Sequence, residues 1–138
     1  MQRKTKEITV TLRPDNIVET KVNDDITELS LEGVPEVIAA TNEVHHSTNA
    51  PKAALMHMPS FYVKKSIIKG YASNRDVEVV AVAMLTHSFS SQIIGNLLLT
   101  MRSRVLTLRN ETPEPSKVFR DKEAAIKWLL EHLAAKKQ

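Results

Sequence analysis

Apolar and polar residues alternate near the start of the chain. Residues 8–12 place Ile, Val and Leu at every second position, with threonines between them. A period of two is typical of a strand with one buried face. Turn-forming residues follow at 14–16, and a second run rich in β-branched residues covers 17–22. Two strands joined by a short Pro-Asp-Asn turn predict an N-terminal β-hairpin.

The spacing of apolar residues changes to three and four after this hairpin. It predicts a helix that begins near Pro35, because proline fits the first turn of a helix, and ends near His46. Similar stripes predict helices over 61–72 and 89–101, the latter with Ser88 as its N-cap. Near the C-terminus, Asp121 offers a carboxylate to cap a last amphipathic helix.

Two almost wholly apolar runs lie between the predicted helices. Ala53–Met58 and Val77–Ala83 have the character of central parallel strands that are covered on both faces. A short β-favouring run ending at Arg120 predicts a closing strand. The expected order is β-β-α-β-α-β-α-β-α. Strands that alternate with helices predict a single α/β domain over 1–138, with a mixed sheet formed by the hairpin and β-α crossovers.

Composition narrows the function classes. The chain of 138 residues is 42% hydrophobic and 25% charged, as expected for one globular domain. It contains no cysteine and no apolar run of the about 18 residues that a membrane span needs, and its charged N-terminus lacks a signal-peptide core. We therefore expect a cytoplasmic protein. The net charge of +3 comes with basic clusters at the termini and few aromatic residues, so no nucleic-acid binding is expected.

Several segments together resemble a known family. They are residues 77–101, with the helix Phe89-Ser90-Ser91-Gln92-Ile93-Ile94-Gly95-Asn96-Leu97, and residues 117–130, with a Lys-Val-Phe strand before an Asp-Lys-Glu-Ala-Ala-Ile-Lys-Trp-Leu helix. The chain resembles the SpoIIAA-like members of the STAS superfamily, which are small bacterial domains. The resemblance implies a regulatory or protein-interaction module without catalysis, capable of forming a homodimer.

Classical STAS proteins are switched by phosphorylation of a serine at the end of a central strand. The corresponding position here is Ser60, but the Asp-Ser-Ser/Thr-Gly signature of the family is absent around it. Two readings stay open. Ser60 either caps the helix that follows or receives a phosphate held by the free N–H groups of that helix start.

The remaining chemistry converges on the same edge of the sheet. His57 and His87 follow the two apolar strands, and ligands of α/β sheets bind at the carboxyl ends of the strands. With Ser60 they form a candidate edge for a small ligand, such as a nucleotide or a lipid, or for an unrecognised enzyme. No metal-binding spacing, glycine-rich phosphate loop or nucleophile elbow is present, so we expect no cofactor.

The helix predicted over 89–101 carries more apolar residues than one sheet contact needs. Phe89, Ile93, Leu97 and Met101 are candidates for an interface with a protein partner or with a second copy of the chain.

Overall fold

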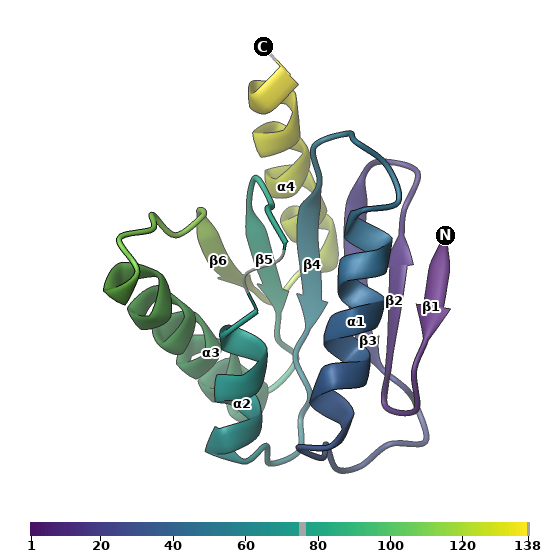
Figure 1. Cartoon of the computed structure of the whole chain (residues 1–138), viewed down its shortest axis with the longest axis vertical. Helices are drawn as coiled ribbons and strands as arrows, with labels where there is room; N and C mark the ends of the chain where they lie inside the picture. Colours follow the sequence, from purple (N-terminus) through teal and green to yellow (C-terminus); the bar gives the residue numbers. More distant parts are fainter. Residues whose placement is uncertain (75–76, 138) are drawn as a thin grey trace.

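One mixed β-sheet forms the centre of the molecule (Figure 1). The structure, a computed structural model, describes residues 1–74 and 77–137. Within these residues six strands lie in the sheet in sequence order: β1 (Gln2–Lys4), β2 (Ile8–Leu12), β3 (Ile17–Val22), β4 (Ala53–His57), β5 (Val82–Leu85) and β6 (Ser116–Phe119). β1, β2 and β3 pair antiparallel, and β3 to β6 pair parallel.

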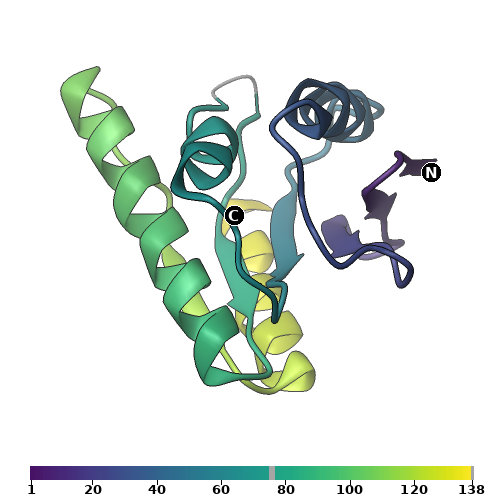
Figure 2. The same ribbon diagram turned by 90° about the horizontal axis from the view of Figure 1, so that it is seen from below.

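Four helices cover the two faces of this sheet: α1 (Gly33–His45), α2 (Lys65–Ala72), α3 (Phe89–Leu108) and α4 (Lys122–Lys137). α1, α2 and α3 connect consecutive parallel strands and lie together on one face, whereas α4 lies on the other (Figure 2). Neighbouring residues of β4 therefore belong to different cores: Ala54 and Met56 face α1 to α3, while Ala53 and Leu55 pack beneath α4.

The predicted α/β class and the N-terminal hairpin are confirmed. In the hairpin β2 pairs with β3 from Ile8↔Val22 to Leu12↔Val18. Its turn contains Asn16 at φ 66°, in the left-handed region that asparagine tolerates better than most residues. The extra strand β1 was not predicted. Its three residues are all polar and exposed, so no apolar period marks it.

The two central strands are neighbours, as predicted, but one has different bounds. β4 and β5 pair parallel from Ala54↔Val82 to His57↔Leu85, so their C-terminal ends share one rim of the sheet. The predicted strand Val77–Ala83 is wrong in its limits, because β5 covers Val82–Leu85. Only this later part is buried on both faces, whereas Val77 and Val79 are half-buried and line a hollow beside the sheet.

Local capping explains where two helices begin. The Ser88 side chain accepts a hydrogen bond from the backbone N–H of Ser91, and the Ser91 side chain accepts one from the N–H of Ser88, which is a capping box. Asp121 accepts a hydrogen bond from the N–H of Glu123 at the start of α4. Both predicted caps are confirmed. The predicted start of α2 at residue 61 is wrong, because the helix begins at Lys65.

Candidate functional site

The predicted rim brings two of its three residues together. The rings of His57 and His87 lie with their centroids 6.4 Å apart and their planes 29° from parallel. Ser60 follows β4 at an exposed bend. Because the N-cap of α2 is Lys64, Ser60 does not cap this helix, and the capping prediction is wrong. Phosphorylation of Ser60 stays a prediction.

Glu19 holds His57 in place on the face that α4 covers. Oε2 of Glu19 in β3 lies 2.5 Å from Nε2 of His57 and 3.0 Å from Nζ of Lys122, the first residue of α4. Arg13 approaches the other carboxylate oxygen at 3.8 Å. The cluster therefore ties β3, β4 and α4 together. Sequence reasoning missed it, because Glu19 and His57 become neighbours only through the β3–β4 register.

The protonation of this pair follows from opposing effects. Burial alone would raise the pKa of Glu19, but the hydrogen bonds from His57 and Lys122 outweigh it and hold that pKa below its ordinary value. Burial lowers the pKa of His57 despite the neighbouring carboxylate. At neutral pH the pair is an ionised Glu19 that accepts a hydrogen bond from a neutral imidazole.

The predicted interface residues divide into two groups. Phe89 is 75% exposed and Ile93 is 52% exposed, and they lie one turn apart on α3. Leu97 and Met101 are partly buried against the core beneath α1 to α3. The interface role of all four residues stays a prediction, with Phe89 and Ile93 as its most exposed part.

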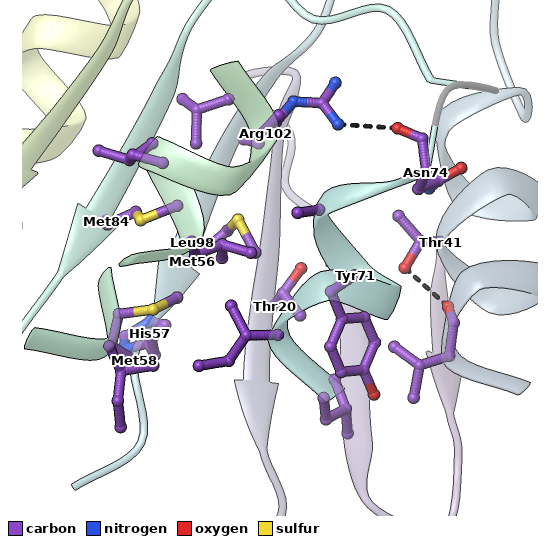
Figure 3. A pocket seen from close by; sticks show the side chains of 18 of the residues that line it. Thr20, Thr41, Met56, His57, Met58, Tyr71, Asn74, Met84, Leu98 and Arg102 are labelled. Atoms are coloured by element: carbon purple, nitrogen blue, oxygen red, sulfur yellow. Dashed lines mark hydrogen bonds between the residues drawn. The ribbon is translucent and has the colours of Figure 1, made fainter. Parts of the chain in front are cut away.

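A cavity of about 170 Å³ lies between the sheet and the helices α1, α2 and α3 that cover one of its faces (Figure 3). Its floor comes from β3, β4 and β5, and includes Met56 and Met84. Its roof comes from α1, α2 and α3, and includes Tyr71 and Leu98. Protein interiors contain few voids larger than a water molecule, so a void of this size is a distinct feature of the fold. The sequence analysis did not predict it.

The walls of the cavity are almost wholly apolar. Aliphatic side chains from these six elements and from Ile8 of β2 surround it, together with the three methionines Met56, Met58 and Met84. An engineered cavity of about 150 Å³ with similar aliphatic and aromatic walls stays dry and binds benzene. The cavity described here has the size and the lining to do the same with a small apolar molecule.

Few polar groups reach the cavity. At one end Nε of Arg102 donates to Oε1 of Glu114 at 2.7 Å. Nη1 of Arg102 donates to the carbonyl of Asn74 at 2.7 Å (Figure 3). In the wall, the Thr41 hydroxyl donates to the carbonyl of Val37 at 2.8 Å. The Thr20 hydroxyl on the floor has no hydrogen-bond partner among the described residues.

Two further polar atoms are buried in the cavity wall without a partner among the described residues: Nδ1 of His45 and the hydroxyl oxygen of Tyr71. Burial, assisted by nearby Lys52 and His46, lowers the pKa of His45 to about 4, so its imidazole is neutral at neutral pH. Burial raises the pKa of the Tyr71 hydroxyl. Both side chains therefore contribute no charge to the cavity.

No family model, curated protein or solved structure is significantly similar to this chain. In the part of the chain that the structure describes, no three His, Asp or Glu side chains are placed to hold a metal ion. No helix among the same residues combines the length and the apolar character that crossing a bilayer requires.

Proposed function

We propose that this protein is a non-catalytic binding domain that takes up a small apolar molecule between its sheet and helices α1 to α3. The observation that carries the proposal is the cavity of about 170 Å³ with apolar walls. An apolar molecule that fills this space removes wall surface from water, which stabilises the folded state by about 25 cal/mol per Å² buried.

The cavity favours an apolar ligand over a nucleotide. The phosphates of a nucleotide need several cationic or N–H donors. Among the charged side chains that line the cavity, Arg102 is already paired with Glu114. Small apolar molecules need no such donors, and the flexible methionines of the floor adapt to their shape.

The geometry also favours binding over catalysis. The polar pair that resembles acid–base machinery, His57 with Glu19, belongs to the face that α4 covers, as does Lys122. The cavity lies under α1 to α3, and although His57 is among its lining residues, Nε2 of its ring pairs with Glu19. That nitrogen is therefore not available to a molecule in the cavity. This fits the STAS-like regulatory module that the sequence suggests, with occupancy of the cavity as its signal.

A thermal-shift titration with toluene and p-cresol tests the proposal. Binding to the folded state raises the melting temperature, because it stabilises that state by RT ln(1 + L/Kd) at ligand concentration L. We expect a rise for the wild type and for Phe89→Ser, which removes the most exposed part of the α3 surface. We expect none for Ala54→Leu, which fills the cavity from β4. The proposal is rejected if neither probe raises the melting temperature of the wild type. It is also rejected if the rise for Ala54→Leu is as large as the rise for Phe89→Ser and the wild type.

A second candidate function rests on the exposed pair Phe89 and Ile93. Large apolar side chains exposed one helical turn apart form a small patch of the kind found at interfaces, and we propose that it contacts a second copy of the chain. Light scattering at high micromolar concentration should give the mass of two chains, and the double variant Phe89→Ser/Ile93→Ser should give the mass of one. A wild-type mass equal to one chain overturns this candidate.

A further inference from the structure

We propose that the molecule taken up by the cavity is uncharged, about the size of a single substituted ring, and bound through one oxygen that forms a hydrogen bond with Thr20. This inference rests on the proposed function and adds the chemistry of the ligand. It follows from three properties of the cavity: its size, its balance of charge and the hydroxyl group of Thr20, which like that of Tyr71 has no partner among the described residues.

Size sets the first limit. A cavity of about 150 Å³ accommodates benzene, so the present cavity of about 170 Å³ fits one ring with a small substituent. Three methionines line it, and thioether sulfur makes favourable contacts with the edges of aromatic rings. Both features favour a monocyclic aromatic molecule over a long acyl chain.

Charge sets the second limit. The only full charges among the described lining side chains belong to Arg102 and Glu114, which neutralise each other at 2.7 Å. The lining His45 is neutral because burial lowers its pKa to about 4. His57 also contributes to the lining, but its ring pairs with Glu19 on the opposite face of the sheet. An ionised ligand would be buried without a counter-ion, which costs several kcal/mol.

Thr20 supplies the third property. It lies between Val18 and Val22 on the side of β3 that faces the helices, where a valine would suit the apolar surroundings. Its hydroxyl group lies among Met56, Tyr71 and Leu98 in Figure 3 and has no partner among the described residues. Thr20 is half-buried, and a hydroxyl group beside apolar walls stabilises the fold more when something bonds to it. The oxygen of a ligand in the cavity can form that bond.

Thr41 provides the matched comparison. It lines the same cavity from α1, but its hydroxyl already donates to the carbonyl of Val37 at 2.8 Å. Replacement of threonine by valine preserves shape at both positions and removes one hydroxyl group. Only at Thr20 does that group have no bond within the protein, so only there should the change affect a ligand.

The test measures Kd for three probes of similar size by calorimetric titration: toluene, p-cresol and benzoate. In the wild type we expect toluene and p-cresol to bind and benzoate to bind at least tenfold more weakly than p-cresol. Thr20→Val should weaken p-cresol about 3- to 10-fold, the value of one neutral hydrogen bond, and leave toluene within twofold. Thr41→Val should change neither probe. Thr20→Ser keeps the hydroxyl group and should keep the affinity for p-cresol relative to toluene.

The outcomes separate the two proposals. Suppose that toluene binds to the wild type, and that Thr20→Val weakens the binding of toluene and p-cresol equally or not at all. The cavity is then a binding site, but the inferred hydrogen bond between the ligand and Thr20 is wrong. If benzoate binds as tightly as p-cresol, the inference that the ligand is uncharged is wrong. If the wild type binds none of the probes, the proposed function itself is wrong. Ligand-free Thr20→Val should unfold at the same or a higher temperature than wild type, because it loses only an unbonded hydroxyl group.

Discussion

Ala53 and Ala54 are consecutive residues of β4, and we expect the same substitution to have opposite effects at the two positions. Ala54 faces the cavity between the sheet and α1 to α3. Ala53 is fully buried on the other face, where alanines of β5 and α4 allow that helix to approach closely. Replacing each alanine by valine adds the same two carbon atoms to a cavity in one variant and to a packed layer in the other.

The magnitudes follow from these surroundings. In Ala54→Val the two added carbons become buried without displacing a neighbour, and at about 0.8 kcal/mol each they raise the free energy of unfolding by about 1.5 kcal/mol. In Ala53→Val they enter a layer with no free space, and such overpacking lowers stability by about 1–3 kcal/mol. The propensity of valine for strands acts equally on both variants, so the difference between them, about 2.5–4.5 kcal/mol, reports the unequal space available on the two faces of the sheet.

Urea denaturation followed by circular dichroism gives both values as shifts of the midpoint at constant m. The variant Ala54→Val should also bind toluene more weakly than wild type, because it occupies part of the same space. If Ala54→Val is destabilised as much as Ala53→Val, the face beneath α1 to α3 is fully packed and the reasoning fails.

Three further predictions concern other parts of the molecule. Because the pKa of His45 lies near 4 when folded and near 6.5 when unfolded, the unfolded chain binds the proton first, and acidification from pH 6.5 to 4 should cost about 3 kcal/mol of stability. His45→Leu should remove that loss and the exposed His46→Asn should not, as measured by urea denaturation across pH. Glu19→Gln should lower the pKa of His57 further, because the carboxylate favours the protonated imidazole; an unchanged NMR titration of His57 would contradict the pair. Gly95→Ala should stabilise α3 by about 1 kcal/mol, since the new methyl group meets Met58 at an ordinary 3.4 Å, and a lower urea midpoint would show that α3 is packed more tightly than described.

The sequence predicted the parts of the fold that depend on local pattern. The alternation of residues 8–12, the apolar run of β4 and the caps Ser88 and Asp121 each act over a few neighbouring residues, and all appear where expected. The strand β1 has no such pattern, because its three residues are polar and exposed and pair with β2 without burying an apolar side chain.

The candidate sites depend on register and packing, which local patterns do not contain. The proximity of His57 and His87 could be predicted from the sequence, because the two residues lie at the C-terminal ends of neighbouring parallel strands. Glu19 joins His57 only once β3 and β4 are aligned. The cavity is lined by side chains from seven helices and strands, so no single segment indicates it. One signal was available: Thr20 interrupts the apolar face that Val18 and Val22 define on β3.

The methionine methyl groups provide the most direct test of whether a small molecule enters the space between the sheet and α1 to α3. Of the five methionines, Met56, Met58 and Met84 line the cavity, whereas Met1 is exposed and Met101 lies outside the lining. In a spectrum of the protein labelled with ¹³C at the methionine methyl groups, added toluene should shift the three cavity signals and give intermolecular NOEs to them, with Met1 and Met101 unchanged. Signals that stay in place at all three, or shifts as large at Met1, would contradict the account.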